Sequence, residues 1–189
     1  WALAVAVASP AAVQLKLVVA ARSCGGEAEG GDASGTARAR VARRTLRLAG
    51  AEHVEVALGS AKSACGHATP LTEWAAGEEG SFDEDGVRRM GEVISAFDDD
   101  SGAVLLALGP LTSVAECIRR YPEVLRKARL VVMAGSVYSS GAAGAGPSAE
   151  YNARSDPGAL AAVLSAPWAA PPTLAPLDVA GSAKAALEG

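Results

Sequence analysis

Residues 104–137, VLLALGPLTSVAECIRRYPEVLRKARLVVMAGSV, carry the pattern that decides the fold. They begin within a continuous apolar run, AVLLAL (103–108), which is typical of a strand buried on both faces. A Gly-Pro pair ends this run, and Thr112 or Ser113 can then cap a helix. The segment RLVVMAG (129–135) gives a second buried strand. A strand, a helix and a strand this close together predict two parallel strands joined by a right-handed crossover.

Apolar runs and amphipathic segments alternate over the rest of the chain as well. This pattern predicts an α/β fold with an open, mostly parallel Rossmann-like sheet flanked by helices. The length of 189 residues predicts a single domain. The helix expected at 1–9 is apolar enough to be buried. Further strands are expected at 13–20, 54–58 and 173–177, and helices at 1–9, 36–48, 87–97 and 156–165.

Open α/β sheets bind ligands outside the carboxyl ends of their strands. The expected strand ends therefore mark the region where a site should lie. They fall at 22–26, 59–60, 108–113, 133–136 with the loop that leads to Asn152, and Asp178.

Charge and hydropathy exclude two classes of partner. The net charge is −4, and the basic runs at 38–47 and 119–129 are better interpreted as solvated sides of helices than as a nucleic-acid surface. The apolar opening of the chain lacks a basic leading region and contains Pro10 and Lys16, so we do not expect it to act as a signal peptide. No run reaches the roughly 20 apolar residues of a membrane span. Neither nucleic acid nor a membrane is expected as a partner.

The cysteines favour a reducing compartment, and we expect the cytoplasm. Cys24, Cys65 and Cys117 are odd in number and lack CxxC spacing, which argues against a disulfide framework or a zinc site. Cys117 lies on the apolar side of a predicted helix and is interpreted as a small core residue. The only histidines, His53 and His67, fall in polar connections, so a catalytic Cys–His pair is not expected.

Three other features fail the spacing tests for ligand sites. The Gly-rich stretch 23–35 has neither the GxxxxGK[ST] nor a clean GxGxxG spacing of phosphate loops. The acidic runs at 83–85 and 98–100 lack the glycine and terminal glutamate of an EF-hand. We interpret the first acidic run as the beginning of a helix and the second as a turn.

Several motifs in one order resemble the inosine–uridine nucleoside hydrolase family. The family has a GPLTN turn, a basic helix leading into a VVLMGG-like strand, an AEFN…DPEAA segment and an LDVT strand end. This chain has GPLTS (109–113), VVMAGS (131–136), AEYN (149–152), DPGAL (156–160), APLDVA (175–180) and, earlier, RLAGAEHVEVALGSA (47–61). The resemblance covers nearly the whole chain. It implies a nucleoside hydrolase-type fold and cleavage of the N-glycosidic bond of ribonucleosides with the help of Ca²⁺.

The resemblance also implies roles for four residues. Glu150 and Asn152 match the pair that hydrogen-bonds ribose hydroxyls, and Met133 matches a methionine of the sugar pocket. Leu108 matches the position whose backbone carbonyl binds calcium, although any residue supplies a carbonyl. The alternative interpretation of Glu150 and Asn152 is a polar loop before a helix.

Other family features are missing or changed. The aspartate-rich DxDxGxDD loop, which supplies the base and calcium carboxylates, belongs before Trp1, and a further aspartate and a histidine belong beyond Gly189. No catalytic residue is therefore assigned, the family fold is expected to be incomplete at both ends, and Ca²⁺ is not expected to bind this chain as it stands. The departures within the chain are an irregular insertion around 22–24, Glu79 in place of the histidine of an HGxxG turn, Ser113 in place of the asparagine of GPLTN, and Gly144 in place of a second asparagine.

Two functional hypotheses follow. In the first, the chain is the central part of a Ca²⁺-dependent nucleoside N-ribohydrolase that acts on a ribonucleoside. In the second, the family fold persists as a pseudo-enzyme, a structural subunit that docks on a protein partner or on copies of itself. On either hypothesis we expect the 189 residues alone to be catalytically inactive.

Overall fold

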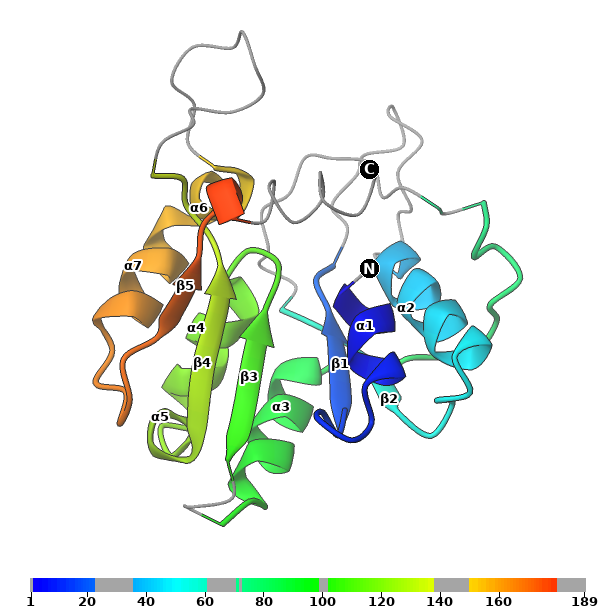
Figure 1. Cartoon of the computed structure of the whole chain (residues 1–189), viewed down its shortest axis with the longest axis horizontal. Coiled ribbons are helices and arrows are strands. Elements are labelled where there is room, and N and C mark those ends of the chain that lie inside the picture. The colour runs from blue at the N-terminus through cyan, green and yellow to red at the C-terminus, as the bar shows by residue number, and fades with distance from the viewer. Residues whose placement is uncertain are drawn as a thin grey trace, which may run out of the picture. The chain divides into compact units, whose positions relative to one another are not determined.

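The computed structural model describes residues 2–22, 36–60, 71, 73–98, 102–137 and 150–179. Its contacts group into two compact units, residues 1–93 and 94–189. Every strand pair among the described residues is parallel, which confirms the predicted parallel α/β fold (Figure 1). In the part of the chain that the structure describes, no helix combines the length and apolar character needed to cross a bilayer.

The first unit is a two-stranded sheet with helices. Strands β1 and β2 pair in register from Leu17 opposite Glu55 to Ala20 opposite Leu58. Their buried side chains pack with those of α2 and with Phe82 in one apolar core. The elements are α1 (Ala2–Ala8), β1 (Leu17–Ala20), α2 (Ala37–Leu48), β2 (Glu55–Leu58) and α3 (Gly86–Ser95), whose last residues belong to the second unit.

The second unit holds a three-stranded sheet in the order β3-β4-β5. Helix α4 packs against α7, and Figure 1 shows α4 and α5 behind the sheet. Pro122 separates two helices, since α4 ends before it and α5 begins after it. The elements are β3 (Ala103–Ala107), α4 (Thr112–Arg120), α5 (Val124–Lys127), β4 (Ala128–Met133), α6 (Tyr151–Ser155), α7 (Pro157–Ser165) and β5 (Thr173–Ala175).

Strand β3 is not buried on both faces, so that expectation is wrong. Val104 and Leu106 are 54% and 49% exposed, whereas Leu130 and Val132 on the neighbouring strand are buried. The register places Leu106 beside Val131 and alternates faces along both strands. Among the described residues, helices cover one face of this sheet and leave the apolar side chains of the other face open to solvent.

Helix α1 is not buried either, which corrects a second expectation. None of its residues is buried, and only Leu3 and Val7 contact the core of the first unit from its edge. An apolar helix that packs on one side only exposes the rest of its surface. Strands β1 and β5 are also shorter than the predicted 13–20 and 173–177.

A nearby side chain caps the beginning of α3, as the sequence predicts, but the predicted cap of α4 is not formed. The acidic run 83–85 begins α3 as predicted, because an Asp85 carboxylate oxygen accepts the Arg88 backbone N–H at 2.9 Å. The predicted cap of α4 is wrong: Leu111 occupies the cap position and no side chain caps the helix. Thr112 instead donates its hydroxyl to Asp156 at 2.6 Å.

Cys117 is fully buried on α4, as predicted, and burial raises the pKa of its thiol to about 12. The thiolate is the reactive form, so this thiol should be inert in the native chain. We expect a chain with Cys117 as its only cysteine (Cys24→Ser, Cys65→Ser) to resist a disulfide reagent at pH 8 and to react fully once denatured. The matched control carries Leu106→Cys and Cys117→Ala in the same background, so its single thiol lies on the open face of the sheet. This thiol should react with the reagent at once in the native chain. Equal native rates for the two chains would contradict the packing of α4.

Candidate functional site

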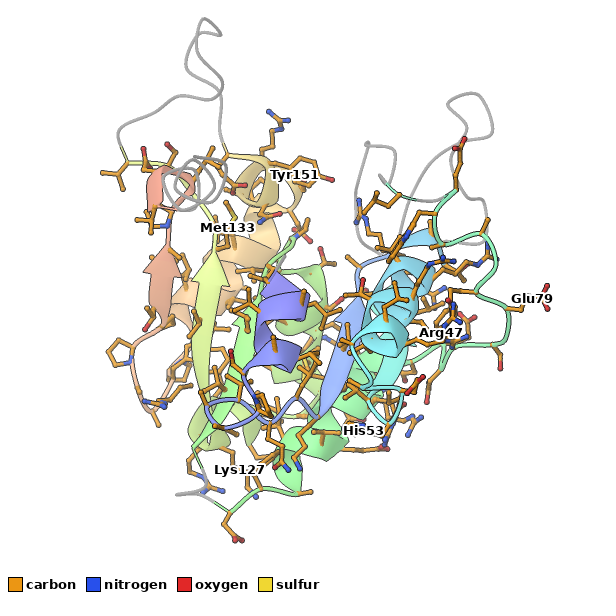
Figure 2. All side chains as sticks on the ribbon, turned by 45° about the vertical axis from the view of Figure 1, so that its right-hand side comes forward. Arg47, His53, Glu79, Lys127, Met133 and Tyr151 are labelled. Atoms are coloured by element: carbon orange, nitrogen blue, oxygen red, sulfur yellow. The ribbon has the colours of Figure 1, made fainter. Side chains whose placement is uncertain are left out.

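Four residues predicted as site residues meet at the carboxyl ends of β3 and β4. We call Leu108, Met133, Glu150 and Asn152 the strand-end cluster. Leu108 directly follows β3, and Met133 is the last residue of β4. Glu150 occupies the cap position of α6 and Asn152 lies in its first turn. Figure 2 shows Met133 at the end of β4 on the side where Tyr151 begins α6.

The amide of Asn152 joins the two strand ends. Its Nδ2 donates to the Leu108 carbonyl oxygen at 3.2 Å and to the Met133 carbonyl oxygen at 2.9 Å, and it lies 3.2 Å from the Met133 sulfur. Asn152 is only 7% exposed, so these bonds are largely shielded from water. One side chain on α6 thus fixes the helix to the ends of both β3 and β4.

The Glu150 carboxylate is buried and accepts three backbone N–H groups. Oε1 accepts from Asn152 at 2.8 Å, while Oε2 accepts from Ala153 and from Gly135, each at 3.1 Å. The first two bonds cap α6, and the third crosses to the turn after β4. Gly135 has a φ of 78°, a conformation that favours glycine and that turns the chain away from the strand.

Asp178 lies shortly after the third strand, which ends at Ala175, in the region where the strand-end rule places a site residue. Its carboxylate accepts the Val137 backbone N–H at 2.7 Å and the Ser136 hydroxyl at 3.2 Å. The chain after β5 is thereby joined to the turn after β4. The site edge of this sheet is therefore built from three strand ends that side-chain hydrogen bonds link to one another.

The loop that contains Glu79 belongs to the first unit, and arginines of α2 hold it. Arg47 pairs with the buried carboxylate of Glu78. Arg43 donates to the carbonyl oxygens of Glu79 and Ser81 at 2.9 and 2.8 Å. The Glu79 side chain itself is exposed and points away from the unit (Figure 2).

Sequence reasoning missed this use of the basic run at 38–47. The Cζ atom of Arg43 also lies 3.7 Å from the centroid of the Phe82 ring, and that of Arg44 lies 4.9 Å from the centroid of the Trp74 ring. The run is not only a solvated helix side. The spacing of four between Arg43 and Arg47 puts both on one helix face and was the available signal, but their partners lie more than 30 residues away.

The described residues do not by themselves fit the calcium ion that the family resemblance implies. A hard cation needs six to eight oxygen ligands, commonly carboxylates. Among the residues that the structure describes, no three Asp, Glu, His or Cys side chains gather closely enough to hold a metal. The Leu108 carbonyl, predicted as a ligand, accepts the Asn152 amide and so keeps one lone pair, a single oxygen ligand at most. Gly144, Cys24, Cys65 and His67, on which other expectations rest, lie outside the described residues.

Three comparisons place the chain among known proteins. It is 30% identical over 152 residues to an uncharacterized protein of Schizosaccharomyces pombe, covering 74% of this chain and 47% of that protein. It shares its fold with an inosine-guanosine nucleoside hydrolase (19% identity, TM-score 0.68, 96% of this chain and 60% of that one). The fold is also similar to that of the purine-preferring ribonucleoside hydrolase from Gardnerella vaginalis. The two chains are 21% identical with a TM-score of 0.65, and the match covers 94% of this chain and 57% of that one.

The chain thus spans about half the length of the proteins that it matches. The profile described as inosine-uridine preferring nucleoside hydrolase matches residues 1–188. With that match over nearly its whole length, the chain belongs to the inosine-uridine preferring nucleoside hydrolase family.

Proposed function

We propose that the chain supplies the ribose-binding part of a nucleoside N-ribohydrolase site, with the strand-end cluster facing the sugar of a ribonucleoside. The convergence of the cluster supports this proposal most directly. Its members come from three segments up to 44 residues apart, yet they share one edge of a parallel sheet. That edge is where open α/β sheets bind their ligands.

The acceptor atoms that remain in the cluster fit a ligand that donates hydrogen bonds. Both hydrogens of the Asn152 amide are used by the strand ends, so its Oδ1 is the atom left for a ligand, and none of the described residues donates to it. Glu150 Oε2 accepts two bonds and Oε1 only one, which leaves a lone pair on Oε1. Two acceptors on neighbouring groups suit the 2′- and 3′-hydroxyls of ribose.

Hydrolysis needs more than this cluster provides. Cleavage of an N-glycosidic bond through a cation-like transition state requires a group that activates water and charge that stabilises the sugar. The described residues offer neither a free carboxylate in the cluster nor a group of metal ligands. We therefore propose that these 189 residues bind the nucleoside and do not hydrolyse it, and that hydrolysis by the whole protein depends on groups outside them.

The second candidate is a non-catalytic structural module. It is favoured by Glu79, which replaces the family's histidine and points into solvent, and by the open apolar face of β3 with Val104 and Leu106. Such a face suits a protein partner or a second copy of the chain. On this reading the cluster only holds α6 in place. A monodisperse monomer in sedimentation experiments that also binds inosine would exclude it.

Inosine binding separates the two candidates. We expect the chain to bind inosine in calorimetric titration and to bind 2′-deoxyinosine at least tenfold more weakly, because a lost hydroxyl leaves buried acceptors unpaired. Glu150→Gln should weaken inosine binding by a factor of about 10 to 150, since a bond to a carboxylate is worth roughly 1.5–3 kcal/mol. The matched control, Glu79→Gln on the exposed loop, should bind as the native chain does.

A reducing-sugar assay with calcium supplied completes the test. We expect no ribose release from inosine or uridine by the 189-residue chain. Release above the buffer rate would contradict the proposed inactivity. Absence of inosine binding at millimolar concentration would contradict the ribose-binding role and leave the structural module as the better reading.

A further inference from the structure

Two residues outside the strand-end cluster, Thr112 and Asp156, form a second side-chain bond between the turn after β3 and the end of α6. Thr112 Oγ1 donates to Asp156 Oδ2 at 2.6 Å, across 44 residues of chain. Thr112 is the threonine of GPLTS, is 8% exposed and begins α4. Asp156 lies between α6 and α7, and its other oxygen caps α7 by accepting the Ala159 N–H at 2.9 Å.

This bond parallels the one between Asn152 and Leu108, and it lies four residues further along both segments. Both bonds join residues 44 apart, at positions 108 and 152 and at positions 112 and 156. The turn after β3 and the five-residue helix α6 are therefore joined at both of their ends. An isolated helix of five residues is not stable in water, so α6 depends on such tertiary bonds.

We propose that Thr112 and Asp156 are positioning residues that hold α6, and with it Glu150 and Asn152, against the strand ends. This inference rests on the proposed ribose-binding role of the cluster. The carboxylate serves two purposes, because one oxygen caps α7 while the other receives the Thr112 hydroxyl. A hydrogen bond to a charged, part-buried acceptor is among the stronger single bonds available for the purpose.

The two ends of α6 then have different roles, ligand binding at the beginning and attachment to the rest of the unit at the end. At its beginning, Asn152 and Glu150 both join the strand ends and offer their remaining lone pairs to a ligand. At its end, the Thr112–Asp156 bond fixes the helix without presenting any atom to that ligand. Loss of this second bond lets α6 pivot about its first turn, so the two acceptors no longer keep a fixed separation. Affinity for a diol should then fall even though every binding group remains.

The test removes each half of the bond separately. Thr112→Val deletes the hydroxyl and keeps the shape, and Asp156→Ser keeps a cap for α7 but lacks the second oxygen. Amide hydrogen exchange of Arg154, whose N–H bonds to the Glu150 carbonyl at 2.9 Å, reports on α6 directly. Calorimetric titration with inosine reports on the cluster. Thr112→Ser, which keeps the hydroxyl, is the rescue variant.

We expect Thr112→Val and Asp156→Ser each to speed exchange at Arg154 about tenfold and to weaken inosine binding by a similar factor. The double variant should do no more than either single one, because both remove the same bond. Thr112→Ser should restore both readouts. The matched control is Thr45→Val, which removes a hydroxyl bonded within α2 of the first unit and should change neither.

Two results would overturn the proposal. One is exchange at Arg154 that stays at the native rate in both Thr112→Val and Asp156→Ser. The other is faster exchange with an unchanged inosine affinity, which would make the bond structural only. If the native chain binds no inosine, the proposed function fails, and the exchange comparison still decides whether this bond holds α6.

Discussion

Leu130→Ala is expected to lower the free energy of unfolding by about 2–5 kcal/mol, the usual cost of emptying a buried leucine site. Leu130 is 1% exposed, and it lies on the face of β4 that the helices cover. Its register neighbour on β3 is Leu105. Removal of the side chain therefore loses apolar contacts and leaves a cavity that the rigid sheet cannot close.

The matched variant is Leu106→Ala, one position along β3 from that pair and on the other face. Leu106 is 49% exposed, so its truncation should change the free energy of unfolding by no more than about 1 kcal/mol. Urea unfolding of both variants, followed by circular dichroism, measures the difference. Equal losses would mean that the second face of the sheet is covered in solution, which would contradict its open state.

Gly86→Ala should cost about 1–3 kcal/mol although alanine is the better helix former. A Cβ at this position would lie 2.5 Å from the Leu58 carbonyl oxygen and 3.0 Å from the Val19 Cγ1. The segment before Gly86 cannot move away easily, because the Leu58 N–H bonds to the Asp83 carbonyl oxygen at 2.8 Å. Glycine here allows α3 to begin against the ends of β1 and β2.

Gly158→Ala is the matched control in the first turn of α7. There the nearest atom to a new Cβ is Asp156 Oδ1 at 3.7 Å, an ordinary contact. The substitution should stabilise the chain by about 0.5–1 kcal/mol, because alanine loses less backbone entropy on folding. Thermal unfolding of the two variants should move the midpoint in opposite directions. A stabilising Gly86→Ala would contradict the close packing of α3 on the first sheet.

Much of the fold follows from local sequence. The apolar runs give the strands, the Gly-Pro pair and Gly50 end elements, and Asp85 begins α3 as a helix cap. The motifs around residues 108, 133 and 150–152 identify the strand-end cluster before its geometry is known. These features depend on residues close in sequence or on the general rule that parallel strands end at a common edge.

The features that sequence reasoning missed depend on partners far away in the chain. AVLLAL is apolar at every position, so its pattern cannot indicate which face the helices cover. Thr112 has good cap chemistry, yet its hydroxyl goes to Asp156 because the fold brings that carboxylate within 2.6 Å. The arginines of α2 resemble a solvated face until the loop near Glu78 folds onto them.

The ribose-binding role of the strand-end cluster is tested most directly by nuclear magnetic resonance of the ¹⁵N-labelled chain during titration with inosine. The account predicts saturable shifts at the amides that donate to Glu150, those of Gly135, Asn152 and Ala153, together with the side-chain amide of Asn152. 2′-Deoxyinosine should produce the same shifts only at far higher concentration. Resonances that stay unmoved at millimolar inosine, or that move only elsewhere in the chain, would contradict the account.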